Sequence, residues 1–417
     1  MRVREIKVEG LFDTFDHIIP LNLDDHITII HGPNGFGKTI LLQMIHGLLR
    51  GSMDMIVQIP FKKFEISFDD NSRVWIEKPE SNELVEQIQI SNGKYTTPLN
   101  VQEFHNVLPK SWPSLPKMED TQNWSDWMLD PTEVFKLLGN LPKYVVEIPE
   151  WWLELRKSTP AHLVDTERLL TIERGITTEK TVHEVLEPVV KLFAGDLSRR
   201  IHKKFAQYAK ISQELDQTYP KRITEQFGQV PSTNEQVQTK LQELKNQQKL
   251  LEEVDLIQVF ENIILPDTNE NVANIMMIYI HDMQQKLNVF NDLVQKINLF
   301  KDIINKRFLY KAMEISSQVG FLFKDNNDKI LPVTTLSSGE QHELVLFYQL
   351  IFKMPPNSLI LIDEPELSLH VAWQQHFLRD LQRIIALSPF DVLMATHSPQ
   401  IIHDRWDLTV ELKGKPS

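Results

Sequence analysis

A glycine-rich segment near the start of the chain has the spacing of a phosphate-binding loop. Residues 32–39 read Gly-Pro-Asn-Gly-Phe-Gly-Lys-Thr and fit the pattern G-x-x-x-x-G-K-S/T, between an apolar strand pattern and an apolar helix pattern. The glycines let backbone N–H groups approach phosphate oxygens closely, and the start of the following helix adds partial positive charge. Lys38 is therefore expected to contact the β- and γ-phosphates of a nucleotide, and Thr39 to bind Mg²⁺.

Two acidic residues after an apolar run supply the second half of this chemistry. Residues 358–364 read Ser-Leu-Ile-Leu-Ile-Asp-Glu, so a buried strand is expected to present Asp363 and Glu364 at its carboxyl end, where α/β sheets bind ligands. Asp363 is expected to hold Mg²⁺ through water, and Glu364 to polarise the attacking water. Apolar strands often end in acids, but combined with the phosphate loop this pair predicts nucleotide hydrolysis.

The hydrophobic pattern places these groups on α/β elements at both ends of the chain. Strands are expected at 4–8, 17–23, 26–30, 162–165, 320–323, 359–362 and 392–395, a hairpin at 61–78, and helices at 39–49, 343–352 and 371–387. The tryptophans between residues 100 and 160 are expected to pack in a core or bind a partner rather than stack on bases, because basic residues are not interleaved with them.

Residues 180–310 differ in kind, because glycine is nearly absent and Lys, Gln, Glu and Leu dominate. One helix is expected from Gln236 to Val259. A heptad seam is expected further on, because apolar residues alternate at intervals of four and three positions: Met276, Ile280, Met283, Leu287, Phe290, Val294 and Ile297. We expect the N-terminal half of an α/β domain at 1–175, a helical hairpin or small bundle at 176–310, and the C-terminal half at 311–417.

The composition excludes several classes of function. The 417 residues include 44 basic and 57 acidic ones, for a net charge of −13, so a strongly basic nucleic-acid coat is excluded. There are no cysteines, which excludes thiol catalysis, disulfides and cysteine metal sites. With no apolar run of about 18 residues and no apolar signal core, we expect no membrane span and a cytoplasmic location. A basic cluster is either a solvated helix face or a candidate DNA contact: Arg199, Arg200, Lys203 and Lys204.

Three further motifs resemble those of ABC-type ATPases, within the AAA family. Leu336-Ser-Ser-Gly-Glu-Gln341 resembles the signature motif, Asp363-Glu-Pro-Glu-Leu-Ser-Leu-His370 resembles the Walker B and D-loop run, and Ala395-Thr-His-Ser-Pro399 resembles the switch-histidine motif. A helical insertion between two ATPase halves resembles the SMC, RecF and OLD-type branch. The amino-acid sequences of these motifs are also similar to those of ATPases from bacterial anti-phage systems, such as the Septu ATPase.

The resemblance implies an ABC-type P-loop ATPase head, α/β in class and split by a helical insertion, that binds ATP and Mg²⁺ between two heads arranged head to tail. Glu364 and His397 would be catalytic, and Thr39 and Asp363 would hold the metal. One subunit would hold the phosphates through Asn34, Gly35, Phe36, Gly37, Lys38, Thr39 and Ile40. The other would contribute Ser337, Ser338, Gly339 and Glu340, and the D-loop residues Ser368, Leu369 and His370 would lie at the interface.

Some parts of the family pattern have several candidates in this chain. Ser338 replaces a glycine that is common in transporter signatures. The glutamine loop could be Gln87, Gln89 or Gln102, or the segment 165–168 could sense the γ-phosphate instead. Phe12 and Phe15 are the candidates for stacking on the base.

Three functions are compatible with these motifs. The first is an ATPase that forms a homodimer or higher even oligomer and regulates a separately encoded effector, expected to be a nuclease, in an anti-phage complex. No TOPRIM-like domain or metal-nuclease spacing follows the switch motif, so the effector is expected on another polypeptide. The second is a RecF- or SMC-like ATPase of DNA repair or recombination. The third is an ATP-dependent scaffold with little turnover, which the presence of both Asp363 and Glu364 disfavours.

Overall fold

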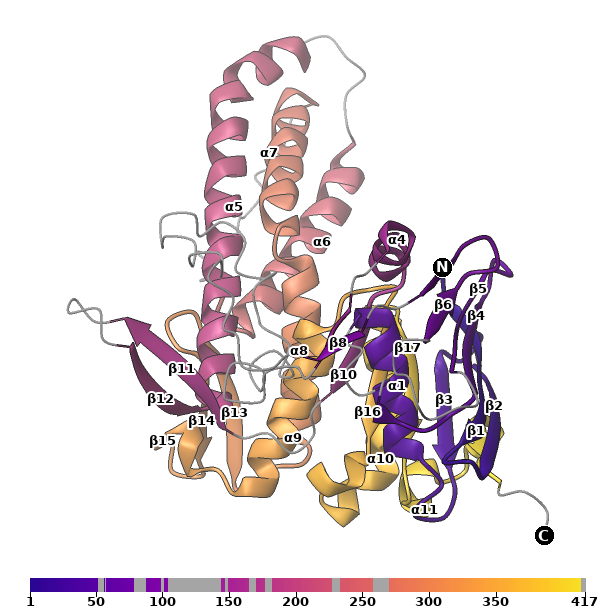
Figure 1. Ribbon diagram of the computed structural model, residues 1–417. Helices are drawn as coiled ribbons and strands as arrows, with labels where there is room; N and C mark the ends of the chain where they lie inside the picture. Colours follow the sequence, from indigo (N-terminus) through magenta and orange to yellow (C-terminus); the bar gives the residue numbers. More distant parts are fainter. Residues whose placement is uncertain are drawn as a thin grey trace. The chain divides into compact units, whose positions relative to one another are not determined.

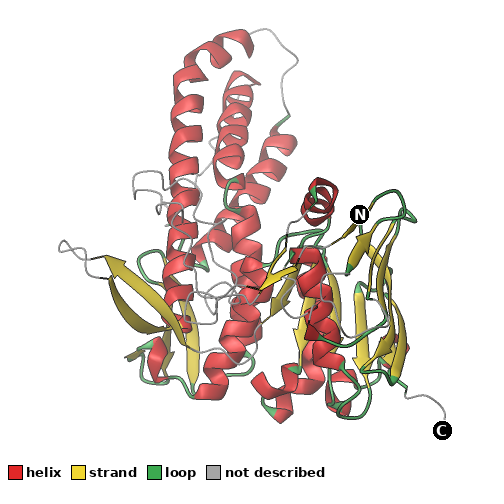
Figure 2. Cartoon of the chain, in the orientation of Figure 1, coloured by secondary structure: helices red, strands yellow, loops and turns green. Residues whose placement is uncertain are grey.

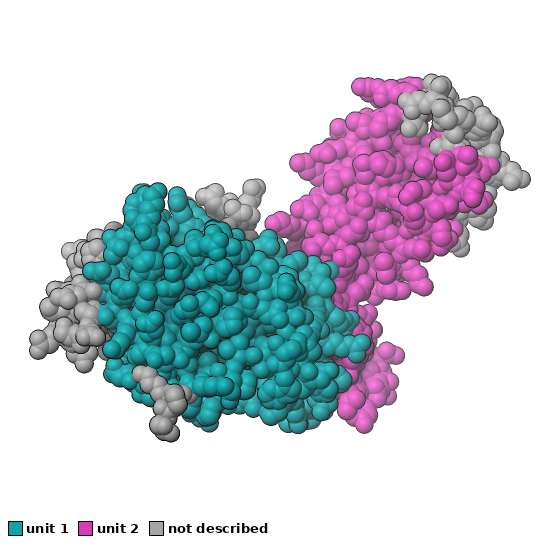
Figure 3. All heavy atoms as spheres, turned by 90° about the vertical axis from the view of Figure 1, so that its right-hand side faces the viewer, with its two compact units in different colours: residues 1–167, 354–417 teal, residues 168–353 magenta. Residues whose placement is uncertain are grey.

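The computed structural model describes residues 1–51, 56, 58–78, 88–98, 101–103, 144–146, 149–164, 170–176, 182–226, 233–257 and 270–413. The chain forms two compact units, one of residues 1–167 with 354–417 and one of residues 168–353 (Figure 3). Both units contain helices and strands (Figure 2). The predicted α/β class with a helical insertion is confirmed.

A five-stranded parallel sheet in the first unit joins both ends of the chain. Its order is β10-β16-β17-β3-β18. Four of its strands, β16, β17, β3 and β10, match sequence predictions, and the apolar runs of β16 and β17 are buried as expected for a parallel sheet. The bounds are β3 (Ile27–His31), β10 (Ala161–Val164), β16 (Leu359–Asp363), β17 (Asp391–Ala395) and β18 (Thr409–Glu411). Because all five strands are parallel, their carboxyl ends meet at one edge.

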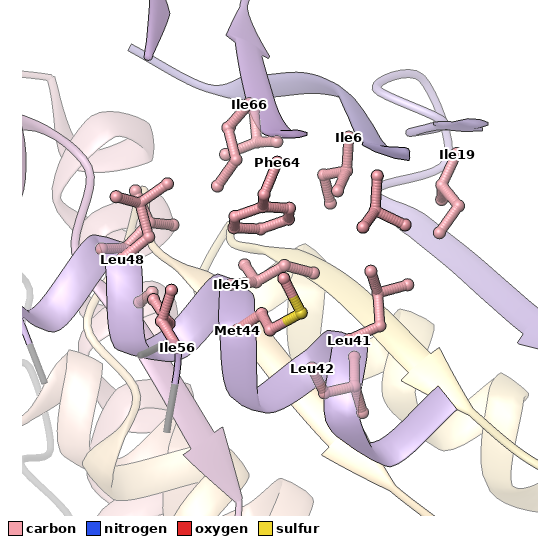
Figure 4. Close-up of a cluster of buried hydrophobic side chains, with 14 of the residues drawn as sticks. Ile6, Ile19, Leu41, Leu42, Met44, Ile45, Leu48, Ile56, Phe64 and Ile66 are labelled. Carbon is pink, nitrogen blue, oxygen red and sulfur yellow. The ribbon is translucent and has the colours of Figure 1, made fainter. Parts of the chain in front are cut away.

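A second, six-stranded antiparallel sheet completes this unit, in the order β2-β1-β4-β5-β6-β7. The helix α1 (Lys38–Arg50) packs on it, and Figure 4 shows side chains of α1 pointing toward Ile6, Ile19 and Phe64. The same buried cluster includes Leu361 and Leu393 of the parallel sheet, so α1 shares a core with both sheets. The strands are β1 (Val3–Leu11), β2 (Phe15–Pro20), β4 (Lys63–Phe68), β5 (Arg73–Glu77), β6 (Gln89–Ser91) and β7 (Thr96–Pro98).

The helix α4 (Glu150–Ser158) anchors one of the predicted core tryptophans. Trp152 is fully buried, and its Nε1 donates a hydrogen bond to the carbonyl oxygen of Leu48 at 2.8 Å. A core role is therefore confirmed for Trp152, whereas Trp112, Trp124 and Trp127 lie outside the described residues. The remaining elements of this unit are β8 (Val101–Glu103), β9 (Tyr144–Val146), the 3₁₀ turns Pro365–Ser368 and Trp406–Leu408, α10 (Val371–Leu387) and α11 (Pro399–Ile402).

Long helices and two small sheets form the second unit (Figure 1). Helix α5 packs against α7 and against β14, and α6 packs against α7. The helices are α5 (Val189–Gln226), α6 (Asn234–Glu252), α7 (Glu270–Asn288), α8 (Asn291–Asn305) and α9 (Ser338–Tyr348), with a π-helical segment at Gln349–Lys353. The strands are β11 (Leu170–Ile176), β12 (Val182–Pro188), β13 (Lys311–Ser316), β14 (Gly320–Asp325) and β15 (Ile330–Leu331).

The predicted apolar seam lies on two helices rather than one. The chain turns between α7 and α8, and the seam residues from Leu287 to Ile297 are buried, whereas Met276 and Met283 of α7 are partly exposed. The helix expected to reach Val259 instead ends at Glu252, because the chain turns at Asp255, which has a φ of 53°. In the described part of the chain, no helix combines the length and apolar composition needed to cross a membrane.

Candidate functional site

The phosphate loop connects β3 to α1, as the sequence predicts. Gly35 and Gly37 have φ values of 85° and 83°, in the left-handed region that favours glycine. A Cβ atom on Gly37 would lie 2.8 Å from Cδ2 of Leu11, whereas one on Gly35 would meet no atom of the described residues within 4 Å. The fold therefore requires glycine at position 37 for both conformation and space, and leaves the backbone at position 35 open to a ligand.

Lys38 is folded back onto this loop. Its Nζ donates hydrogen bonds to the carbonyl oxygens of Gly32 at 2.8 Å and Pro33 at 3.1 Å. Burial lowers the pKa of Lys38, and the negative charges of Glu364 and Asp363 oppose that shift. The amine thus lies in the loop itself, close to both predicted Walker B acids.

Asp363 is at the carboxyl end of β16, where the apolar run predicted it. Burial raises the pKa of its carboxyl group, and a hydrogen bond with the side chain of Thr39 works in the opposite direction. The Asp363 carboxylate and the Thr39 hydroxyl are oxygen ligands of the kind that Mg²⁺ prefers when it also binds phosphates. The predicted metal residues are therefore in contact and fit the ion.

A cavity of about 450 Å³ opens beside these residues. Glu364 and His397 lie on its wall, with Nε2 of His397 3.8 Å from Oε1 of Glu364. The structure thus brings the two predicted catalytic residues to the predicted phosphate loop. The lining residues are Phe12, Asn34, Gly35, Gly37, Lys38, Thr39, Ile40, Glu364 and His397.

Phe36 is the predicted phosphate-loop residue that does not line this cavity. Its ring packs against Phe15, with centroids 5.0 Å apart, and its carbonyl oxygen lies 3.1 Å from Nε2 of the buried His17. Burial lowers the pKa of His17, and the contact with the Phe36 carbonyl opposes the shift. Phe36 therefore anchors the loop to β2, and of the two candidates for base stacking only Phe12 lines the cavity.

Glu366 was not identified from the sequence, although it lies within the Walker B run. Its carboxylate accepts hydrogen bonds from the Thr396 hydroxyl and from the backbone N–H of His397, both at 2.7 Å. Gln374 of α10 was missed as well, and its Oε1 accepts a 2.6 Å hydrogen bond from the Ser398 hydroxyl. The acidic residue two positions after Glu364 was the available signal, but its partners depend on the pairing of β16 with β17.

The signature motif forms the exposed start of α9. Ser337 caps this helix by accepting a hydrogen bond from the backbone N–H of Glu340, whose carboxylate accepts bonds in return from Ser337 and from Lys311. Burial works to raise the pKa of Glu340, but these hydrogen bonds outweigh it and lower the pKa. Ser337, Ser338 and Gly339 are exposed, while the Glu340 carboxylate is engaged within its own unit.

The predicted D-loop residues divide into buried and exposed ones. Ser368 and Leu369 are buried, whereas His370 is exposed and its Nδ1 accepts a hydrogen bond from the N–H of Ala372 at the start of α10. The large apolar side chains on the surface here are Leu367 and Val371, which are 59% and 58% exposed. The protruding part of this run is therefore Leu367, His370 and Val371.

The basic cluster on α5 is divided by its contacts. Arg200 donates a 2.8 Å hydrogen bond to Asp196, which also accepts one from the Tyr348 hydroxyl and pairs with Lys353 at 2.9 Å. The exposed Arg199 lies 3.9 Å from the same carboxylate. Arg199 and Lys203 are exposed and Lys204 is partly buried.

Among the glutamine-loop candidates, Gln89 is exposed on β6, while Gln87, the side chain of Gln102 and residues 165–168 lie outside the described part.

Comparison with known sequences gives one family match and one local similarity. The family described as "AAA ATPase domain" matches residues 1–402. A stretch of 93 residues is 34% identical to the "Retron Ec83 probable ATPase" of Escherichia coli and covers 20% of this chain. The chain spans 17% of the length of that curated relative.

Comparison with solved structures finds head domains of Smc proteins at low sequence identity. An Smc head with an extended coiled coil, bound to the C-terminal domain of ScpA and derived from Pyrococcus furiosus, is 13% identical with a TM-score of 0.41, covering 99% of this chain and 96% of that one. The SMC head domain from Thermotoga maritima is 11% identical with a TM-score of 0.38, covering 99% and 95%.

Proposed function

The chain belongs to the AAA ATPase domain family, and on that premise we propose that it binds and hydrolyses ATP with Mg²⁺ as cofactor. The predicted α/β class with a helical insertion in the sequence is confirmed, and an ABC-type head is part of the proposal. The observation that carries the proposal is the meeting of Lys38, Thr39, Glu364 and His397 at one cavity.

Each of these residues has a distinct task in the proposed reaction. The Lys38 amine would leave its loop carbonyls to neutralise negative charge on the phosphates. Thr39 and Asp363 would hold Mg²⁺, which supplies further positive charge to the phosphate oxygens when bound. Glu364 would accept a hydrogen bond from the attacking water, and the imidazole of His397 would donate one to the γ-phosphate.

The proposed site is completed by a second copy of the chain, head to tail. Ser337, Ser338 and Gly339 support this, because they are exposed at the N-terminal end of a helix and can offer N–H groups to an anion. Closure of two heads around ATP would make the nucleotide state a switch in shape. We propose a homodimer or a higher even oligomer.

The biological role that we propose is regulation of a separately encoded effector, a nuclease, in a bacterial anti-phage complex of the Septu kind. The resemblance of the motif sequences to those of anti-phage ATPases supports this role. A RecF- or SMC-like DNA-repair ATPase and a scaffold with little turnover are the competing functions. Co-purification of the chain with the product of the adjacent gene, followed by a nuclease assay with and without ATP, separates the first role from the other two.

The ATPase proposal is tested by replacing Glu364 with Gln and measuring both hydrolysis and mass. The variant keeps the shape of the side chain but loses the carboxylate, so it should bind ATP, hydrolyse it at least about a hundredfold more slowly, and accumulate as a closed dimer. Glu411→Gln, an exposed change on β18, is the matched control. Hydrolysis by Glu364→Gln at the wild-type rate would show that the assignment is wrong.

A further inference from the structure

Glu366 connects two segments of the candidate site, and we infer that it is a positioning residue that sets where the imidazole of His397 lies. The inference rests on the proposed ATPase function, because it assigns a task within that site. Glu366 belongs to the 3₁₀ turn after β16, and His397 belongs to the loop after β17. The carboxylate therefore joins the Walker B side of the site to the switch loop.

Both oxygens of the Glu366 carboxylate are used in this connection. Oε1 accepts a hydrogen bond from the backbone N–H of His397 at 2.7 Å, and Oε2 accepts one from the hydroxyl of the fully buried Thr396 at 2.7 Å. Hydrogen bonds to an ionised carboxylate are about twice as strong as those between neutral groups. Because the main chain of His397 is held directly, the origin of its side chain is fixed.

Gln374 of α10 makes a second contact with the loop that contains His397. The hydroxyl of Ser398 donates a 2.6 Å hydrogen bond to Oε1 of Gln374, whose Nε2 donates to the carbonyl oxygen of Leu369 at 3.3 Å. Three consecutive residues, Thr396 to Ser398, are thus bound by side chains of the segment that follows Glu364. The loop cannot shift relative to this segment without breaking these bonds.

The charge of Glu366 argues for this task over simple packing. Glu366 belongs to the turn that directly follows Asp363 and Glu364, so three carboxylates lie within four residues. A third negative charge beside two others is unfavourable unless it is offset by good hydrogen bonds. A neutral side chain would fill the same space without that repulsion, whereas only a carboxylate accepts both bonds strongly.

The test is a double-mutant cycle between Glu366 and His397, measured as kcat and KM for ATP. Glu366→Ala should lower kcat by about tenfold or more and leave KM within about threefold, because the imidazole is displaced while the phosphate loop is intact. Glu366→Gln should lower kcat by less than Glu366→Ala does, because its amide oxygen can still accept one of the two hydrogen bonds. In a His397→Ala background, removal of Glu366 should change kcat by less than about twofold.

An equal loss of kcat in both backgrounds would overturn the inference, because Glu366 would then act on water or metal without His397. If Glu366→Ala does not fold, the same comparison is made with Glu366→Gln. A wild-type kcat in the single variant His397→Ala would instead contradict the proposed catalytic role of His397. Failure of that role is therefore distinguishable from failure of the positioning role of Glu366.

A readout without turnover completes the design. In spectra of ¹³C-histidine-labelled protein, the signal that disappears in His397→Ala should shift or broaden in Glu366→Ala and Glu366→Gln, and stay in place in Glu411→Gln. An unchanged His397 signal in the Glu366 variants would overturn the positioning role whether or not the protein hydrolyses ATP.

Discussion

Nε2 of His397 lies 3.8 Å from Oε1 of Glu364, and this contact follows from the register of two parallel strands. β16 and β17 pair so that Asp363 is opposite Ala395, and the backbone N–H of Glu364 donates a 2.9 Å hydrogen bond to the carbonyl oxygen of Ala395. Each strand then delivers a polar residue to the same edge of the sheet. Two motifs that are separate in sequence thus become one wall of a cavity.

Replacing His397 with Ala should lower kcat for ATP hydrolysis by about tenfold to a hundredfold. In the proposed mechanism the imidazole acts on the γ-phosphate, so its loss should remove transition-state stabilisation and change KM little. Steady-state kinetics of purified protein measure the effect. His403→Ala, which changes an exposed histidine of the same region, is the matched control and should behave as wild type.

Replacing Lys38 with Ala should abolish measurable nucleotide binding. The amine is the charged group that lies within the phosphate loop, and Ala leaves the φ angles of the neighbouring glycines unchanged. Titration with a fluorescent ATP analogue measures the affinity, with Lys94→Ala on the exposed turn after β6 as the control. Unchanged affinity in Lys38→Ala would contradict the phosphate-loop assignment.

Replacing Asp196 with Ala should destabilise the protein by about 3 kcal/mol, because it leaves Arg200, Lys353 and Tyr348 without their shared partner. Urea unfolding measures the free energy of unfolding. Asp404→Ala, which removes an exposed carboxylate, is the control and should unfold at the same urea concentration as wild type. Equal stabilities of the two variants would contradict a structural role for the Asp196 cluster.

The same cluster predicts a dependence of stability on pH. Burial alone would raise the pKa of Asp196, but the charges of Lys353 and Arg200 outweigh it and lower the pKa to about 2. Because the folded pKa is below the usual value of about 3.9, this contribution is present above pH ~4 and is lost as the pH falls toward 2. Urea midpoints should therefore converge between wild type and Asp196→Ala in that range.

The exposed members of the basic cluster predict how any DNA binding should respond to mutation. Arg199→Ala with Lys203→Ala should weaken binding and reduce the slope of log affinity against log salt by about one for each phosphate that is no longer neutralised. Arg200→Ala should mainly lower stability, because its guanidinium is bound to Asp196. Fluorescence anisotropy at several salt concentrations measures the slopes. An unchanged slope in the double variant would show that Arg199 and Lys203 are solvated surface residues that do not contact DNA.

The sequence predicted those site residues that belong to short, continuous motifs. Lys38 and Thr39 follow from glycine spacing, and Asp363 follows from an apolar run that ends in acids. The predicted strands, such as β16 and β17, were found because a hydrophobic pattern repeats over a few residues, whereas short strands such as β7, β15 and β18 were missed. These signals need no knowledge of which strand pairs with which.

The roles of Glu366 and Arg200 could not be predicted in the same way. Glu366 meets Thr396 only because β16 and β17 are neighbours in register, and a single sequence does not give strand order. Arg200 looked like a free cation until the packing of α5 on α9 placed Tyr348 beside Asp196. Tertiary contacts therefore decided which charged residues remain exposed.

The most direct test of a composite site shared by two copies of the chain mixes two inactive variants and measures ATP hydrolysis. Lys38→Ala removes the phosphate loop's amine, and Gly339→Asp places a negative charge at the start of α9. Aspartate should fit at position 339, because a Cβ atom there would meet no atom of the described residues within 4 Å. Each variant alone should be inactive in a head-to-tail dimer, since each disables both composite sites.

In the mixture, a dimer of one copy of each variant has one site with both defects and one intact site. Mixing should therefore restore roughly a quarter of the wild-type activity if the subunits exchange at random. Activity that stays at the level of the separate variants, with exchange confirmed by mass measurement, would contradict a site shared head to tail by two copies of this chain.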